Sequence, residues 1–465
     1  MNLLLQKEYR LRGWKGDPFF LEHFPDRSLI RLTPEEFAFF LRCDGKTEIR
    51  PDAWPREPKW AREKGVVLPA GGGAGLQHVQ EYRLYPNRKV SELHLSLTGR
   101  CNCSCRHCFN APDCNPRTTE PDLDRLTGLL DQMDACGVGK LRLDGGEPLM
   151  REDFLQFTAE MERRGIRAGQ IVTNGLLITP ELVDTLKSQG HDPVWFVSFD
   201  GLGHHDWIRG VKGAEKKALQ SIGLLCSRGC SVTVHQCLWR GNLDSVHDTI
   251  CMLRDLGVSR YRIMTVEPSL RWRQTAAEQT ISAEEWLAYM PDFLEWWYEN
   301  RIDMDLDLDV WSYWMHGRKT DRVRIVPDLA SQGLTDRAPL CRTNRDRPFI
   351  DADGRLVHCM ALSGASPAYG LLWGNVYEGD DLQTLFTDSA YLREVGCTCG
   401  EFKESHAQCR VCHWRDRCAV GCRAEAVAQC GDIRGIDRRI CLFYQSGCYE
   451  RLKKIAEKHH LRVYD

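Results

Sequence analysis

The chain has 465 residues, 42% of them hydrophobic and 27% charged, which is typical of a globular protein of two or three domains. A net charge of −3 argues against binding to nucleic acid or anionic lipid through overall positive charge. No run of about 18 apolar residues predicts a membrane span, and charges interrupt the apolar core that a signal peptide at the N-terminus would need. We therefore expect a cytoplasmic protein that has neither nucleic acid nor membrane as a partner.

The 22 cysteines are the unusual feature of the composition. In a chain this long without an export signal, metal binding is favoured over a disulfide scaffold. Cys43, Cys136, Cys237 and Cys251 stand singly among apolar residues and are expected to be small buried hydrophobes. Most of the others gather in two clusters, which carry the functional prediction.

Residues 1–90 predict a small domain of strands and helices. Thr33 precedes Pro34, Glu35 and Glu36, which predicts a helix start, because proline fits a first helical turn and acids complement its positive dipole end. The glycine-rich segment 71–75 indicates a linker after this domain.

Between residues 91 and 310, short apolar runs alternate with amphipathic segments. The predicted strands span residues 93–98, 140–145, 169–175, 195–201, 231–238 and 261–266. Strands separated by helices favour parallel pairing, since a helix supplies the long crossover that parallel neighbours need. We expect an α/β fold, an open sheet or a partial (β/α)6 barrel, with its site at the carboxyl ends of the strands.

The first cysteine cluster follows the first of these strands, as Cys101-x3-Cys105-x2-Cys108. Three thiolates this close can hold one four-iron cluster and leave one iron open to a further ligand. Taken alone, the cluster is also compatible with part of a zinc site. Cys103 lies within the loop, but its spacing does not fit the triad.

Three turns follow the next three strands, where a parallel sheet binds ligands. The first is Gly145-Gly146-Glu147-Pro148, whose glycines permit close backbone approach and whose carboxylate can complement an ammonium group. Pro148 also fits an ordinary first helical turn. The other two turns are Thr173-Asn174-Gly175 and Ser198-Phe199-Asp200-Gly201.

The cysteine spacing and the GGEP segment together resemble the radical S-adenosylmethionine superfamily over most of the central region. The resemblance implies a 4Fe–4S cluster on Cys101, Cys105 and Cys108, whose open iron binds S-adenosylmethionine and whose electron cleaves it to a 5′-deoxyadenosyl radical. It also implies that the GGEP segment binds the amino group of the methionine moiety, and that Ser198 and Arg209 reach the ribose or the carboxylate. The further cofactor-binding candidates are Asn174, Asp200 and Asn242.

Residues from about 336 onward have weak periodicity and eleven cysteines, so bound metal is expected to hold this segment together. The cysteine spacing resembles that of SPASM domains, which carry two auxiliary iron–sulfur clusters. The resemblance implies one cluster on Cys409, Cys412, Cys418 and Cys441, and a second on Cys341, Cys359 and Cys422. The fourth site of the second cluster is either open or filled by Cys397, Cys399 or Cys430.

Residues 1–90 look like the winged-helix leader-binding domains of peptide maturases in this group. The resemblance therefore implies three domains: a winged-helix-like domain (1–90), a radical S-adenosylmethionine barrel (91–310) and a SPASM domain (336–465). A cap that only shields the barrel is the alternative for residues 1–90.

The expected substrate is a ribosomal precursor peptide with a leader, and the expected reaction forms a thioether or a carbon–carbon crosslink. Met360 follows Cys359 where sulfatase maturases carry an aspartate base, so sulfatase-type oxidation is an alternative, as is epimerisation. A non-catalytic iron–sulfur carrier is an alternative from another class, although a carrier has no use for an open iron. A flavodoxin or a ferredoxin is the expected electron donor.

Overall fold

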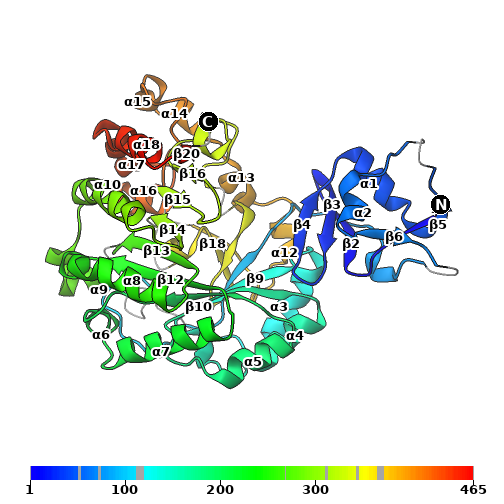
Figure 1. The fold of residues 1–465 in the computed structure, drawn as a ribbon, viewed down its shortest axis with the longest axis horizontal. Coiled ribbons are helices and arrows are strands. Elements are labelled where there is room, and N and C mark those ends of the chain that lie inside the picture. The colour runs from blue at the N-terminus through cyan, green and yellow to red at the C-terminus, as the bar shows by residue number, and fades with distance from the viewer. Residues whose placement is uncertain are drawn as a thin grey trace.

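The computed structural model describes residues 2–50, 54–71, 75–110, 120–267, 269–308, 313–341, 345–363 and 371–463. The centre of the glycine-rich segment 71–75 lies outside the described residues. Figure 1 shows an N-terminal unit on one side of a large central sheet, with the last helices packed on the far side of that sheet.

The N-terminal unit contains two small sheets with strand orders β5-β1-β6 and β4-β3-β2-β7. Helix α1 begins where the sequence predicts, because the Thr33 hydroxyl accepts from the Glu36 amide and the Glu36 carboxylate accepts from the Thr33 amide. Phe39 and Phe40 of α1 are fully buried in a core confined to this unit. The elements are β1 (Asn2–Leu5), β2 (Tyr9–Trp14), β3 (Asp17–His23), β4 (Ser28–Arg31), α1 (Pro34–Leu41), β5 (Asp44–Glu48), α2 (Lys59–Glu63), β6 (Val67–Pro69) and β7 (Arg83–Tyr85).

Aromatic side chains fix this unit to the central region. The Trp14 indole donates to the Cys136 carbonyl (3.0 Å) and stacks on Tyr85. Tyr85 in turn lies against Gly137, where a Cβ would come within 2.6 Å of its ring. The winged-helix assignment of residues 1–90 remains a prediction.

The central sheet has thirteen strands in the order β19-β18-β17-β8-β9-β10-β11-β12-β13-β14-β15-β16-β20, and it is open at both edges. All strand pairs from β8 to β14 are parallel. The six predicted strands are therefore confirmed as β8 (Leu93–Ser96), β9 (Lys140–Asp144), β10 (Arg167–Thr173), β11 (Val194–Ser198), β12 (Val232–Leu238) and β13 (Arg260–Thr265). The prediction missed β14 (Asp305–Leu308), because aspartates interrupt its apolar pattern.

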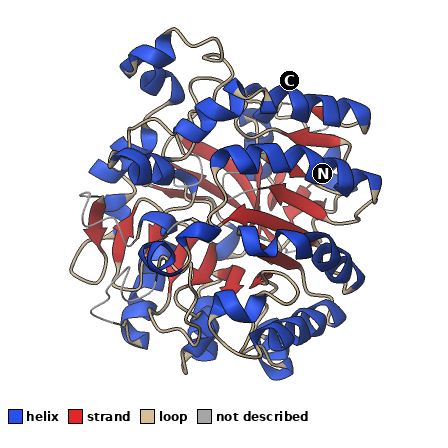
Figure 2. Cartoon of the chain, turned by 90° about the vertical axis from the view of Figure 1, so that its left-hand side faces the viewer, coloured by secondary structure: helices blue, strands red, loops and turns tan. Residues whose placement is uncertain are grey.

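Helices cover the sheet, as Figure 2 shows with the red strands enclosed by blue helices. The three amphipathic segments singled out in the sequence form α3 (Leu123–Ala135), α4 (Phe154–Arg163) and α5 (Pro180–Ser188). The others in this region are α6 (His205–Arg209), α7 (Ala214–Ser227), α8 (Val246–Asp255), α9 (Leu270–Thr275) and α10 (Ala283–Glu299).

The C-terminal region is richer in helices than its sequence suggests, so the expectation of few regular elements is wrong there. The helices are mostly short, which is why they give weak periodicity. They are α12 (Leu382–Leu385), α13 (Ala390–Gly396), α14 (Cys399–Ser405), α15 (Ala407–Arg410), α16 (Arg423–Cys430), α17 (Arg438–Gln445) and α18 (Cys448–Lys458). Further strands extend the central sheet at both edges. Two precede the C-terminal region, β15 (Trp314–His316) and β16 (Arg322–Arg324), and four belong to it, β17 (Phe349–Ile350), β18 (Arg355–Val357), β19 (Leu372–Asn375) and β20 (Arg462–Val463).

The architecture is thus an α/β fold built on an open, largely parallel sheet. A search of the described residues finds no helix with the length and apolar character needed to cross a bilayer.

Candidate active site

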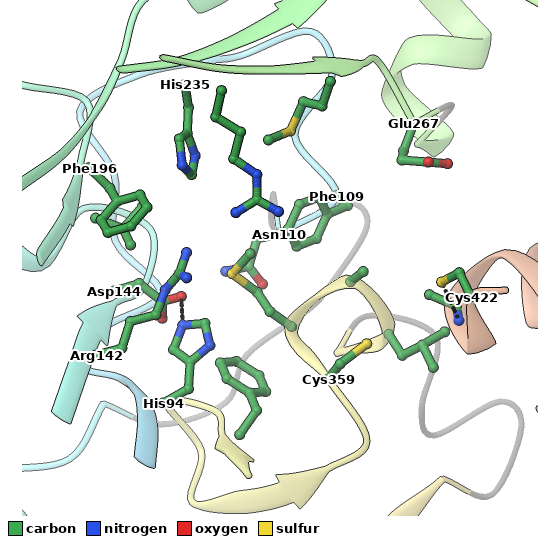
Figure 3. A pocket seen from close by; sticks show the side chains of 18 of the residues that line it. His94, Phe109, Asn110, Arg142, Asp144, Phe196, His235, Glu267, Cys359 and Cys422 are labelled. Atoms are coloured by element: carbon green, nitrogen blue, oxygen red, sulfur yellow. Dashed lines mark hydrogen bonds and ion pairs between the residues drawn. The ribbon is translucent and has the colours of Figure 1, made fainter. Parts of the chain in front are cut away.

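One cavity of about 1900 Å3 joins the two cysteine-rich parts of the chain. It lies over the carboxyl ends of the central strands and is lined by Cys101, Cys105 and Cys108 at one end. Cys341, Cys359 and Cys422 of the C-terminal region line it as well. Figure 3 shows Cys359 and Cys422 across the cavity from side chains of the central sheet.

The first cysteine loop is held in place by helix α6. The Ser104 amide donates to the Arg209 carbonyl (3.0 Å), and the Arg106 amide donates to the Ile208 carbonyl (2.8 Å). The loop also meets the turn after β10, where the Asn174 side-chain amide donates to Asn102 Oδ1 (2.7 Å). Contacts with α6 and with the turn after β10 thus position the loop.

Two thiols of the triad, those of Cys101 and Cys105, are polarised toward the thiolate form. A hydrogen bond from the Cys103 thiol lowers the pKa of Cys105 well below its usual range, assisted by the Arg209 guanidinium, whose Nη1 lies 3.7 Å from Cys105 Sγ. The same thiol lowers the pKa of Cys101 to about 7. Cys103 has the opposite shift, since donating to two thiolates raises its own pKa. Thiolates are the form that ligates iron.

Gly145 and Gly146 pack directly on the loop that carries the triad. A Cβ on Gly145 would lie 2.4 Å from the Thr98 carbonyl oxygen, and one on Gly146 would lie 2.2 Å from that of Arg100. Gly145 also has a φ of 149°, which favours glycine. Both glycines line the cavity, and their lack of side chains lets this turn pack against the backbone of the cysteine loop.

Glu147 does not face the cavity, in contrast to the ammonium-binding role considered from the sequence. Its carboxylate is fully buried and accepts from the Thr173 hydroxyl (2.8 Å), the Asn174 amide (2.7 Å) and the Leu149 amide (3.2 Å). Burial raises its pKa to about 7. The side chain therefore ties the turn after β9 to the end of β10.

Arg209 lines the cavity and forms a buried ion pair with Asp200. Its Nε lies 2.7 Å from Asp200 Oδ2, and Asp200 also accepts from the Cys237 amide (3.0 Å). Asn242 donates to the carbonyls of Asp200 (2.9 Å) and Cys237 (3.0 Å) and is fully buried. Asp200 and Asn242 therefore support Arg209 from behind instead of lining the cavity.

The predicted site residues thus divide into two groups. Those that line the cavity together are Cys101, Cys105, Cys108, Gly145, Gly146, Asn174, Ser198 and Arg209. Those behind its wall are Glu147, Pro148, Asp200 and Asn242, each of them buried.

Ionisable residues inside the sheet were not predicted from the sequence. His94 on β8 bonds to Asp144 on β9, while Arg142 and His235 project into the cavity from β9 and β12 (Figure 3). Burial lowers the pKa of Arg142 to about 10 and that of His235 well below its usual value. The signal was available, because each of these residues alternates with apolar ones along a predicted strand.

Cys237 is a further difference from expectation. It was assigned to the scattered buried thiols, yet it lines the cavity. Cys43 and Cys136 do behave as buried hydrophobes, with burial raising the pKa of each to about 12.

The division of the C-terminal cysteines into two cluster-binding groups remains a prediction, and some of these thiols lie near one another. The thiols of Cys409, Cys412 and Cys418 lie close enough to Cys441 to affect one another's pKa. Cys359 similarly affects the pKa of Cys422. Among the three thiols considered as a fourth ligand of the second group, Cys399 lines the cavity, whereas Cys397 and Cys430 are not among its lining residues.

The donor set fits iron–sulfur clusters better than a single metal ion. Across the described ranges, no three histidine, cysteine or acidic side chains converge on a point where one ion could bind. A four-iron cluster makes a different demand, because each thiolate binds its own iron at a separate corner. Three cysteines on one loop, of which Cys101 and Cys105 have lowered pKa values, meet that demand.

Residues 95–253 match the model of the radical SAM superfamily. The chain is 25% identical over 338 residues to an AdoMet-dependent heme synthase of Methanosarcina barkeri, covering 72% of this chain and 92% of that protein. It is 30% identical over 173 residues to a PqqA peptide cyclase of Ruegeria pomeroyi, covering 37% and 46%. Its fold is similar to that of Streptococcus suis SuiB bound to the precursor peptide SuiA, with a TM-score of 0.62, 14% identity, and coverage of 94% and 99%.

Proposed function

We propose that this chain, which carries a radical SAM domain at residues 95–253, cleaves S-adenosylmethionine reductively and crosslinks a ribosomal precursor peptide. Cys101, Cys105 and Cys108 would hold the 4Fe–4S cluster that binds S-adenosylmethionine. The C-terminal groups would hold two auxiliary clusters, one on Cys409, Cys412, Cys418 and Cys441, and one on Cys341, Cys359 and Cys422. Cluster chemistry of this kind requires a reducing compartment such as the cytoplasm.

The observation that carries this proposal is the single cavity shared by the first cysteine loop and by Cys341, Cys359 and Cys422. A crosslink between two substrate positions releases one hydrogen atom to the 5′-deoxyadenosyl radical and then one proton and one electron. An enzyme making such a bond needs an electron acceptor that the substrate can approach. A C-terminal cluster on the same cavity would meet this need.

The bound cluster would supply the electron that cleaves S-adenosylmethionine into methionine and the 5′-deoxyadenosyl radical. The protein's own part is to bind and orient. Gly145 and Gly146 line the cavity beside the cysteine loop, and the Arg209 guanidinium, held by Asp200, can pair with the carboxylate of S-adenosylmethionine. Ser198 and Asn174, at neighbouring strand ends, are the ribose candidates.

The share of this chain that the similar proteins cover favours a peptide substrate. PqqA peptide cyclases are relatives by sequence, and the SuiB structure that covers 94% of this chain contains a precursor peptide. Residues 91–465 are only about four fifths of the chain, so that coverage must reach into residues 1–90. In this region β4 lies at a sheet edge, where a leader can add as a further strand.

The test is an anaerobic assay of the reconstituted protein with S-adenosylmethionine and dithionite. We expect 5′-deoxyadenosine to form, and to fall at least 100-fold in Cys105→Ala, with Cys43→Ala as the control for loss of an uninvolved thiol. Peptides encoded beside the gene are then added, and a loss of two hydrogens (about 2 Da) is sought by mass spectrometry. Formation of 5′-deoxyadenosine without such a product from any of these peptides would contradict the peptide assignment.

A second candidate is a tetrapyrrole with carboxylate groups. The heme synthase relatives cover more of this chain than the Ruegeria cyclase, and the cavity contains many arginines, among them Arg142, Arg262 and Arg271. Arginines can pair with substrate carboxylates. This candidate predicts that a tetrapyrrole carboxylate binds the protein and is consumed in the assay with S-adenosylmethionine and dithionite. Consumption of the tetrapyrrole, with no change in mass of any added peptide, would favour it over the peptide assignment.

A further inference from the structure

The outer face of the first cysteine loop differs from its inner face. Almost every described residue of the loop from 99 to 110 lines the cavity, but Arg106 does not. Its guanidinium lies 4.7 Å over the ring of Trp207 on α6, and its Nε donates to the Trp207 carbonyl (3.1 Å). Arg106 is covalently next to Cys105, so this outer face lies one residue from the buried triad thiol.

Trp207 is an unusual surface residue because it is large, apolar and 39% exposed. It stands on two buried tryptophans, Trp239 and Trp272, whose ring centroids lie 5.4 and 6.2 Å from its own. A rigid aromatic side chain on a packed base loses little entropy on binding, which is typical of an anchor in a protein interface.

The charges around Trp207 are predominantly basic toward solvent. Lys212, in the turn after α6, and Lys216 and Lys217, in the first turn of α7, are exposed. Within the described parts of the chain, none of these lysines is in an ion pair. The acids Asp206 and Glu215 are only partly exposed, since Asp206 accepts from the Gly213 and Glu215 amides and Glu215 accepts from the Gly203 amide. The exposed Asp244 is paired with His204, which leaves the three lysines as the unpaired exposed charges among these residues.

We propose that this face, formed by Arg106, Trp207 and Lys212, is the docking surface for a small acidic one-electron carrier protein, such as a flavodoxin. The proposal rests on the proposed reductive cleavage of S-adenosylmethionine, which consumes one electron per turnover. In the transfer, one electron leaves the reduced carrier and enters the cluster held by the triad, with no bond made or broken. A basic rim steers an acidic carrier, and a small interface around one anchor suits a transient electron-transfer complex.

The other surface that could bind the carrier is the C-terminal loop that contains Cys409 and Cys412. Val411, between Cys409 and Cys412, is 86% exposed beside the exposed Arg410. It offers a second apolar and basic surface near a cysteine cluster, and so provides a matched comparison. We favour the Trp207 face because it adjoins the triad that S-adenosylmethionine cleavage requires, whereas Val411 adjoins the other group.

The experiment compares Trp207→Ala and Lys212→Glu with Val411→Glu and with Lys454→Glu, an exposed lysine of α18. Binding to oxidised flavodoxin is measured by calorimetry at about 20 and 200 mM salt. The rate of 5′-deoxyadenosine formation is measured with reduced flavodoxin and with dithionite. For the first pair we expect binding and the flavodoxin-driven rate to fall at least about tenfold, with a weaker salt dependence for Lys212→Glu and an unchanged dithionite-driven rate.

Unchanged binding in the first pair, or a loss confined to Val411→Glu, would overturn the proposal. A change of oligomeric state in Trp207→Ala with unaltered flavodoxin binding would assign the face to self-association, and would overturn it too. Absence of 5′-deoxyadenosine with either reductant would contradict the proposed function, while the calorimetry would still decide whether the carrier docks here.

Discussion

The two cysteine-rich parts of the chain differ in how far the protein prepares them for metal. The triad comes from one loop of eight residues. Local donors hold the Cys101 and Cys105 thiols toward the thiolate form, with the pKa of Cys101 lowered to about 7. The C-terminal cysteines come from segments spread over residues 341–441. Burial raises the pKa of Cys418 to about 12 and that of Cys422 well above its usual range.

The reason lies in what surrounds each group. The triad loop is bonded to α6, to the turn after β9 and to the turn after β10. Strands β9 and β10 are anchored in the main core, whereas α6 buries Ile208 in a smaller cluster with Trp239 and Trp272. Cys397, Cys399 and Cys409 belong to or border a small separate cluster with few large side chains. In the first region the fold positions the ligands, whereas in the second we expect metal to stabilise the fold.

Removal of iron by an anaerobic chelator should therefore have the largest effect of the changes considered. It should reduce protection from amide exchange in the C-terminal cysteine region but not in the central sheet. We expect amide exchange in residues 399–441 to accelerate at least about 100-fold, because the free thiols there revert to buried neutral groups and no large core replaces the clusters. Strands β9 to β12 should keep their protection. Hydrogen exchange with mass spectrometry checks both, and equal loss in the two regions would remove the distinction.

Gly146→Ala tests the close packing between the turn after β9 and the first cysteine loop. A Cβ there would lie 2.2 Å from the Arg100 carbonyl oxygen, so the loop must shift. We expect the affinity for S-adenosylmethionine to fall at least about tenfold in equilibrium dialysis of the reconstituted protein. Gly128→Ala on α3, where a Cβ meets no atom within 4 Å, is the control and should bind normally.

Asp200→Asn should have an intermediate effect. The substitution leaves the buried Arg209 guanidinium without its anionic partner, and breaking such a pair typically costs about 3–5 kcal/mol of stability. We expect a lower midpoint of thermal unfolding and several-fold weaker binding of S-adenosylmethionine. Asp244→Asn, whose side chain is 84% exposed, should change neither quantity. Unchanged binding in Asp200→Asn would show that Arg209 needs no such support.

The smallest effect should appear in the pH dependence of thiol alkylation in the metal-free protein. A thiol with a lowered pKa is already thiolate at neutral pH, so the rate for Cys101 should level off above about pH 7. The rate for Cys418, whose pKa is raised to about 12, should still rise about tenfold per pH unit through pH 9. Mass spectrometry resolves the two sites by the shape of each profile, and parallel profiles would contradict the assigned difference.

Much of the fold was predictable because its signals are local. The six parallel strands follow from apolar runs between amphipathic helices, and the start of α1 follows from Thr33 and Glu36. The C-terminal helices were missed because short helices give little periodicity. Strand β14 was missed because its aspartates hide an element that only the neighbouring β13 makes recognisable.

The candidate site divides in the same way. Sequence motifs identified the segments at the strand ends, yet they did not separate side chains that face the cavity from those behind its wall. Glu147 shows why: the motif places it beside two cavity-lining glycines, but three donors from the turn after β10 and its own turn draw its carboxylate inward. The ionisable layer of His94, Arg142 and His235 depends similarly on strand register.

The sequence by itself determined the parallel α/β order, the triad on one loop and the glycines beside it, since each depends on neighbours within a few residues. Only the tertiary structure decided that the cavity extends from that triad to Cys341, Cys359 and Cys422, and that Asp200 supports Arg209 from behind. The physical reason is that these relations join segments far apart in the chain, and the packing of the sheet brings them together.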